Sequence, residues 1–249
     1  MERTLAPRPK LSENLSSDAL FTFTPKLEYL ISMLKNGIHP RYIYERIPIQ
    51  NKTWYYKVAA KCFCDIPLGK VKTHLTYFGN YGLGIKKSYL KGKGVSPIMY
   101  IHSNSGWIID ALVAGGLKNL KSYPTLPFLK RHMGQDFKRG DDGKYTQKFR
   151  TFYDEREWRY IPKDNDLETG GNIKQIKDGI EQIRRKNIDT PYSKSDIPLN
   201  PQVIEYIIID SFNEFKDLKS SLKDSFPDTD DYELMLSKIL IAEGILRNF

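Results

Sequence analysis

The sequence predicts an α+β protein with a split, mostly antiparallel sheet and flanking helices, and three observations lead to this class. The 249 residues suit one large domain or one domain with a helical appendage, and 40% of them are hydrophobic, which supplies a core. Short runs of β-forming residues are interspersed with apolar residues at helical spacing. No internal repeat is present, so one core built from mixed elements is expected.

The first elements follow an N-terminal arm. Residues 1–18 hold two prolines and several serines and are expected to form this loose arm. Residues 20–24 predict a short strand. Thr24 and Pro25 are then expected to start a helix, as its N-cap and first helical residue, and Gly37 is expected to end it. The apolar positions of this helix are Leu27, Leu30, Ile31 and Leu34.

The middle of the chain alternates between strands and helices. Weak alternation predicts a strand over residues 54–64. A helix follows, with Asp65 as its cap, Pro67 near its start and Gly79 at its end. Residues 81–85 predict a strand whose glycines allow close packing. A strand over residues 97–102 and a helix over residues 106–114 complete this part.

The C-terminal part begins with a basic helix expected over residues 173–186. The apolar run 203–209 predicts a strand at or near the centre of the sheet. Helices are expected over residues 211–223 and 232–246, and the last is expected to seal the body rather than bind a partner. Three parts follow: the arm, a main domain over residues 19–210, and C-terminal helices over residues 211–249 packed on it.

Charge is distributed unevenly along the chain. The net charge is +9, but residues 200–249 hold 5 Lys/Arg against 10 Asp/Glu, which leaves 34 against 20 on residues 1–199. A body this basic suggests a polyanionic partner such as nucleic acid, and the acidic end suggests a segment that folds back or docks on another protein. A well-solvated surface without a partner is the alternative.

Residues 118–150 predict a basic, aromatic, loop-rich insertion. They hold 9 Lys/Arg against 3 Asp, with aromatic residues interleaved. Cations bind phosphates and exposed rings stack on unpaired bases, so RNA or single-stranded DNA is the expected partner. The alternative is an ordinary long loop whose rings pack into the core. The candidate nucleic-acid-binding residues are Lys130, Arg131, Lys138, Arg139, Lys148 and Arg150.

The cysteines and histidines favour neither metal nor redox chemistry. In a strand, Cys62 and Cys64 would point the same way, and a disulfide between them would be strained. With His74 as the nearest third candidate they do not make a zinc site, so two buried small side chains are expected. No phosphate-binding loop, dinucleotide fingerprint or Gly-x-Ser-x-Gly motif is present. No apolar run approaches membrane-spanning length, so a cytoplasmic protein without a signal peptide is expected.

The most informative stretch is Phe152–Tyr160. As a strand it would place Glu155, Glu157 and Arg159 on one face. Paired carboxylates on a rigid strand suit chemistry at a sugar carbon. The alternative is a pair of surface glutamates bridged to Arg156, Arg159 or nearby lysines.

Several ordered blocks lie between residues 18 and 162. They are Leu20–Thr24, Tyr29–Gly37, Ile38–Tyr42, Cys62–Leu68, Tyr77–Gly84 and Phe152–Arg159. Together these blocks resemble the AbiGi family of abortive-infection proteins, which act in bacterial phage defence. The family commonly carries the label antitoxin, which implies no chemistry.

The same blocks are more distantly similar to the layout of ADP-ribosyltransferases, which use NAD as a substrate and need no metal. That resemblance implies that Glu157 stabilises the cation formed at the ribose and that Glu155 orients or deprotonates the acceptor. It implies that Tyr77 stacks on nicotinamide. The implied NAD-binding residues are Thr22, Phe23, Thr24, Arg41 and Tyr77. Many such transferases carry histidine where this chain has Thr22, and Arg41 has an alternative role as the partner of Glu45.

The sequence therefore leads to competing functional predictions. The first is an ADP-ribosyltransferase-like toxin of a phage-defence system that modifies RNA or single-stranded DNA and is controlled by a cognate antitoxin. The second is an inactive antitoxin or sensor that binds a partner toxin. A plain nucleic-acid-binding module or nuclease is the third.

Overall fold

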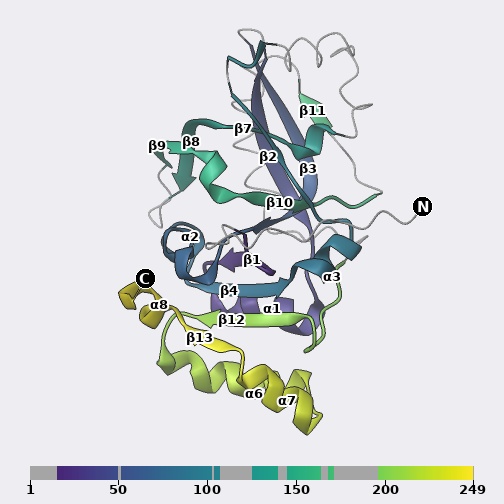
Figure 1. The fold of residues 1–249 in the computed structure, drawn as a ribbon, viewed down its shortest axis with the longest axis vertical. Coiled ribbons are helices and arrows are strands. Elements are labelled where there is room, and N and C mark those ends of the chain that lie inside the picture. The colour runs from purple at the N-terminus through teal and green to yellow at the C-terminus, as the bar shows by residue number, and fades with distance from the viewer. Residues whose placement is uncertain are drawn as a thin grey trace, which may run out of the picture.

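The fold is taken from a computed structural model of the chain (Figure 1). The structure describes residues 16–49, 52–102, 104–106, 125–139, 145–163, 168–170 and 196–248. The helix expected over residues 106–114 lies outside these ranges except for Gly106, its first residue. The helix expected over residues 173–186 and most of the N-terminal arm also lie outside them.

One mixed, mostly antiparallel sheet organises the protein, which is consistent with the predicted α+β class. Its main path runs in the order β13-β12-β4-β1-β3-β10-β5, and β2 and β11 also pair with β3. Among the strands that the structure describes in this sheet, only β12 and β13 pair in parallel. The strands are β1 (Ala19–Thr24), β2 (Arg41–Ile49), β3 (Lys52–Cys64), β4 (Tyr81–Lys86), β5 (Ser96–Pro97), β10 (Glu157–Tyr160), β11 (Glu168–Gly170), β12 (Ile204–Ile209) and β13 (Ile239–Ile241).

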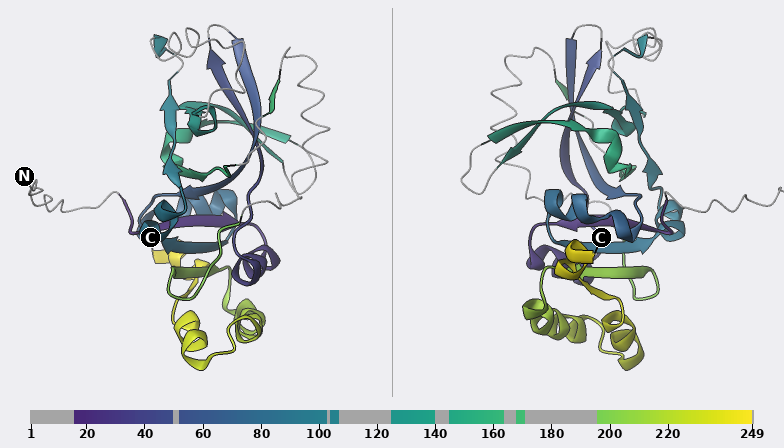
Figure 2. Two further views of the ribbon diagram at one scale, coloured as in Figure 1. Left: turned by 90° about the vertical axis from the view of Figure 1, so that its right-hand side faces the viewer. Right: turned by 60° about the vertical axis from the view of Figure 1, so that its left-hand side comes forward.

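Helices pack on both faces of this sheet and create two cores. The first core holds residues from α1 (Leu27–Asn36), α6 (Phe215–Ser225) and α7 (Thr229–Leu236), and the second holds residues from α2 (Lys72–Phe78) and α8 (Ala242–Asn248). Strand alternation divides β1 between them, because Leu20 lies in the first core and Phe21 in the second. The part of the sheet that these helices cover is called the layered half here. Both views of Figure 2 show the β2–β3 hairpin extending away from it.

The glycines of β4 let aromatic rings lie directly on the strand. A Cβ atom at Gly84 would stand 2.7 Å from Cδ2 of Tyr206 and 2.9 Å from Cε1 of Phe21, and one at Gly82 would stand 3.0 Å from Cδ1 of Phe23. Phe21 and Phe23 stack on one another, with centroids 6.1 Å apart. The predicted close packing at these glycines is confirmed, and it fixes two rings that reach the pocket described below.

The first helix begins later than expected. Thr24 ends β1, Lys26 takes the N-cap position without a side-chain cap, and α1 starts at Leu27. Gly37 ends it with a φ of 78°, as predicted. The role assigned to Asp65 was also wrong, because Lys87 and Ser16 bind its carboxylate, and a short 3₁₀ turn, η1 (Leu68–Lys70), precedes α2.

The basic insertion contains more regular structure than a loop-rich prediction allows. The strands β8 (Met133–Arg139) and β9 (Tyr145–Thr151) form an antiparallel hairpin. Before it, η3 (Leu126–Phe128) leads into β7 (Leu129–Arg131), which pairs in parallel with β6 (Met99–Ile101). The strand expected over residues 97–102 is therefore divided between β5 and β6, and α3 (Lys87–Gly92) precedes them.

The C-terminal segment differs most from its prediction. The helix expected over residues 232–246 is instead α7, the edge strand β13 and α8. The apolar run that was assigned to a helix face pairs with β12, which is the second strand from that edge. No helix within the described ranges is long and apolar enough to cross a membrane.

Candidate functional site

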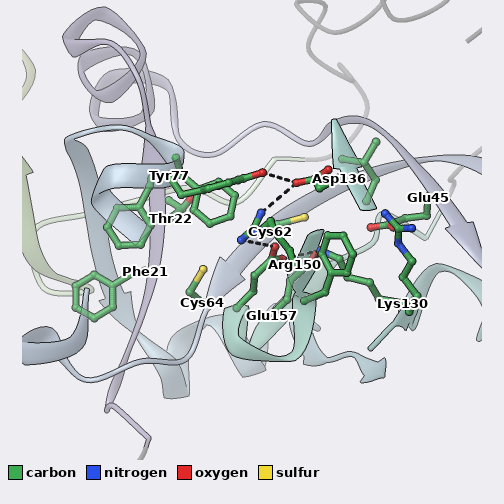
Figure 3. Close-up of a pocket in the computed structure, with 16 residues that line it drawn as sticks. Phe21, Thr22, Glu45, Cys62, Cys64, Tyr77, Lys130, Asp136, Arg150 and Glu157 are labelled. Carbon is green, nitrogen blue, oxygen red and sulfur yellow. Dashed lines mark hydrogen bonds and ion pairs between the residues drawn. The ribbon is translucent and has the colours of Figure 1, made fainter. Parts of the chain in front are cut away.

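A polar pocket of about 290 Å³ opens where β1, β3 and β10 lie side by side (Figure 3). Phe21 pairs with Cys64, and Cys64 pairs with Glu157, so one row of side chains crosses three strands on the same face. Tyr77 and Phe78 of α2 close one wall, and residues of the β7–β9 segment close another. The pocket therefore unites segments that are more than a hundred residues apart in the chain.

Glu155 and Glu157 both line this pocket, but they do not share a strand. Residues Phe152–Glu155 form a 3₁₀ turn, η4, and Arg156 has a left-handed φ of 46° before β10 begins at Glu157. The predicted strand over residues 152–160 is thus wrong for its first half. Arg159 lies on the same face of β10 as Glu157, as expected.

A buried lysine joins the two carboxylates. Nζ of Lys130 donates to Oε2 of Glu155 at 2.6 Å and to Oε2 of Glu157 at 2.7 Å. Nε of Arg159, which is fully buried, donates to Oε1 of Glu157 at 2.6 Å, and its Nη2 pairs with Glu45. Because all of these charges are removed from water, each depends on its partners for stabilisation.

A second cluster forms the opposite wall around Arg150. Its Nη2 pairs with Oε1 of Glu155 at 3.0 Å and its Nη1 with Oδ2 of Asp136 at 3.2 Å. The guanidinium carbon lies 3.5 Å from the ring centroid of Tyr77, whose hydroxyl donates to Asp136. Dashed contacts in Figure 3 join Tyr77 and Arg150 to Asp136. Arg150 thus covers a face of the ring that was expected to stack on nicotinamide.

The pKa values of the two glutamates are shifted in opposite directions. Burial raises the pKa of Glu155, although Lys130 acts against it. Burial also disfavours the charge of Glu157, but Arg159 and Lys130 outweigh it and hold the pKa of Glu157 well below its ordinary value. Separated pKa values in one pocket are typical of acid–base pairs, and they also arise in structural ion-pair networks.

The cysteines lie in the pocket lining, Cys64 buried as expected and Cys62 only half-buried. Both are free, and burial raises the pKa of each above its ordinary value, with the Glu157 charge adding to the effect. A neutral thiol is a poor nucleophile and a poor metal ligand. Among the described residues no three His, Cys, Asp or Glu side chains form a metal-binding group.

The predicted NAD-binding residues are only partly gathered at the pocket. Phe23, Thr22 and Tyr77 line it. Thr22 pairs with Leu83, so alternation places its side chain with the first core rather than beside the rings of Phe21 and Phe23. Thr24 is buried but is not among the lining residues, and Arg41 lies over the ring of Tyr29 at 5.4 Å, outside the pocket lining.

The predicted nucleic-acid-binding residues divide into two groups. Lys130, Arg131 and Arg150 line the pocket, and Lys130 is only 9% exposed. The side chains of Lys138, Arg139 and Lys148 lie outside the described part of the chain, although their backbones belong to β8 and β9.

Sequence reasoning did not find Glu45, Asp136 or Tyr100 as parts of the site. Glu45 reaches Arg159 from β2, a strand that was not predicted. The hydroxyl of Tyr100 accepts from the backbone N–H of Glu157 at 2.9 Å. Charge was the one feature of the sequence that could have indicated further site residues. A buried strand that carries Glu157 and Arg159 needs partners of opposite charge from other segments.

Fold and pocket together define a mixed α/β protein with a buried, charge-paired polar site. A family model described as "Putative abortive phage resistance protein AbiGi, antitoxin" matches residues 36–210, which is more than half of the chain. The chain belongs to the AbiGi family, as its sequence blocks predicted. The protein "Abortive phage resistance protein AbiGi" of Lactococcus lactis subsp. cremoris is 25% identical over 225 residues, which cover 78% of this chain and 89% of that protein. No solved structure matches the chain.

Proposed function

We propose that this protein is the antitoxin of an abortive-infection pair, a binding protein that restrains a partner toxin. The family description supports this role. The structural observation that supports it is that the charged side chains of the pocket already pair with one another. Glu155, Glu157 and Asp136 each pair with a cation, and Arg150 covers a face of the Tyr77 ring. A site whose charged groups already bind one another acts as structural support more readily than as an open catalytic centre.

Growth of a bacterial host tests the proposal. Expressed alone, the protein is expected to leave growth unchanged, and expressed with its partner toxin it is expected to relieve the growth arrest and co-purify with the toxin. Glu157→Gln is a near-isosteric variant that removes one carboxylate charge. If that variant is folded, it is expected to keep the ability to relieve arrest, because restraint by binding needs no catalysis. Growth arrest by the wild type alone would overturn the antitoxin role.

An ADP-ribosyltransferase is the second candidate, and one observation favours it. Glu155 and Glu157 share a pocket with Tyr77, and their pKa values are shifted in opposite directions. In that mechanism the ionised Glu157 stabilises positive charge on the ribose as the bond to nicotinamide breaks. Glu155 accepts the proton of the attacking hydroxyl or amine. Arg150 leaves the Tyr77 ring so that nicotinamide stacks there.

Radiolabelled NAD separates the two candidates. The enzyme is expected to transfer label to RNA, single-stranded DNA or protein, and Glu157→Gln is expected to abolish the transfer. The antitoxin is expected to transfer none. Glu233→Gln, which changes an exposed glutamate of α7, provides the matched control for loss of one carboxylate charge.

A further inference from the structure

A second cavity of about 380 Å³ adjoins the first, between the η1–α2 segment and the η4 turn. Phe78, Arg150 and Glu155 line both cavities, so these three residues form a shared wall. This second cavity has no place in either function proposed above. Its size falls within the range of small-molecule sites.

The cavity carries an excess of positive charge. Arg150 and Glu155 pair with one another across the shared wall. Lys70 and Arg156 also line it, and Asp154 is the remaining carboxylate. No ion pair within 4.0 Å engages Lys70 or Arg156 in the described part of the chain. Two cations that face a common space are suited to a phosphate group.

A buried histidine in the cavity wall lacks hydrogen bonds. The His74 residue is 6% exposed, and neither of its ring nitrogens has a hydrogen-bond partner among the described residues. The backbone of Glu155 lies near the ring without meeting hydrogen-bond geometry. Unsatisfied buried nitrogens are costly, and they commonly mark a position where a water molecule or a ligand binds.

An exposed tyrosine supplies an aromatic surface at the mouth of the cavity. Tyr153 lines the cavity and is 54% exposed. The ring of His132 stacks on it at 5.5 Å, and Tyr100 meets it edge-on at 5.3 Å, so two neighbouring rings hold its position. A fixed, exposed ring beside two cations is the arrangement that binds a nucleobase together with its phosphate.

We propose that the second cavity binds a nucleoside monophosphate group, with the phosphate held by Lys70 and Arg156 near His74 and the base stacked on Tyr153. The group is either a free nucleotide or the phosphorylated end of a single-stranded nucleic acid, since both present the same chemistry. The proposed contacts use neither Glu157 nor a partner toxin, so failure of the antitoxin role or of transfer from NAD would leave this proposal standing.

Calorimetric titration of the full chain tests the site with adenosine 5′-monophosphate, adenosine and inorganic phosphate as probes. The monophosphate is expected to bind at least tenfold more tightly than either fragment. Lys70→Gln and Arg156→Asn are each expected to lower the affinity for the monophosphate about tenfold, because each variant loses one charge-assisted hydrogen bond. Asparagine is chosen at position 156 because it tolerates the left-handed backbone.

Two further variants sharpen the test. Lys72→Gln removes an exposed lysine two residues from Lys70 that does not line the cavity, and it is expected to change nothing. Asp154→Asn removes the opposing carboxylate and is expected to tighten binding severalfold. Short oligoadenylates with and without a 5′-phosphate identify the source. Binding of the phosphorylated form indicates a nucleic-acid end, and binding of the monophosphate alone indicates a free nucleotide.

Three results would each refute the site. The first is absence of binding of both the monophosphate and the phosphorylated oligonucleotide at millimolar concentration. The second is an equal loss of affinity in Lys72→Gln and Lys70→Gln, which would indicate diffuse attraction to a basic surface. The third is oligonucleotide binding that does not depend on the 5′-phosphate.

Discussion

Replacement of Lys130 by methionine tests the charge network most directly. Methionine keeps much of the length of the lysine stem and removes its charge, which leaves Glu155 and Glu157 facing one another at 6% and 4% exposure. Each contact of Nζ, at 2.6 and 2.7 Å, corresponds to about 6 kcal/mol of attraction at an effective dielectric constant of ~20. The cost of burying the ions offsets much of this, so a net loss of about 3–5 kcal/mol is expected.

Urea unfolding followed by tryptophan fluorescence measures this loss. Glu155 protonates more readily in the variant, so the destabilisation is expected to be larger at pH 8 than at pH 5. Lys130→Met combined with Glu155→Gln is expected to recover part of the loss, because Glu157 keeps its contact with Arg159. Lys91→Met, on an exposed face, is the matched control and is expected to change the free energy of unfolding by less than ~0.5 kcal/mol.

Two results would refute this reasoning. One is a loss in Lys130→Met that is no larger than that in Lys91→Met, which would mean that the two carboxylates remain solvated. The other is a double variant that is no more stable than Lys130→Met, which would mean that the lysine stabilises the fold through packing rather than charge.

Three further predictions concern stability. Gly84→Ala is expected to lower the free energy of unfolding by about 1–3 kcal/mol, because its Cβ would stand 2.7 Å from the Tyr206 ring. Gly92→Ala, which has open space around it, is expected to cause no such loss, and thermal melting compares the two variants. Asp228→Ala removes the N-cap of α7 and is expected to cost ~1 kcal/mol in urea unfolding; an unchanged midpoint would contradict it. The depressed pKa of Glu157 contributes stability that is present above pH ~4.3 and is lost as the pH falls. Glu157→Gln is therefore expected to be less stable than the wild type at pH 7 and to lose less free energy of unfolding on acidification. Curves of stability against pH that run parallel for the two proteins would contradict this.

Local patterns predicted the strands that lie in the layered half of the fold. The β-forming runs at β1, β4 and β12 were placed within one or two residues, since each is buried and bounded by turn residues. Residues 239–241 were assigned to a helix because a short apolar run fits either structure. Only the pairing with β12, a tertiary contact, decides between them.

The sequence predicted the part of the site that depends on side-chain alternation along a single strand. Alternation placed Glu157 and Arg159 on one face, but it also placed Glu155 in the strand, since the left-handed turn at Arg156 has no glycine to signal it. The basic character of Lys130 predicted an exposed phosphate contact, whereas its position opposite two buried carboxylates makes it an internal counterion. Composition cannot distinguish these roles, because they depend on which strands meet.

Arg150 lines both cavities, so its side chain is common to their walls. If a ligand in the first cavity drew the guanidinium away from Tyr77, it would alter both the shape and the charge of the second. Reciprocity would then require a ligand in the second cavity to change affinity in the first by the same factor. Under that condition one side chain would couple the two bound molecules.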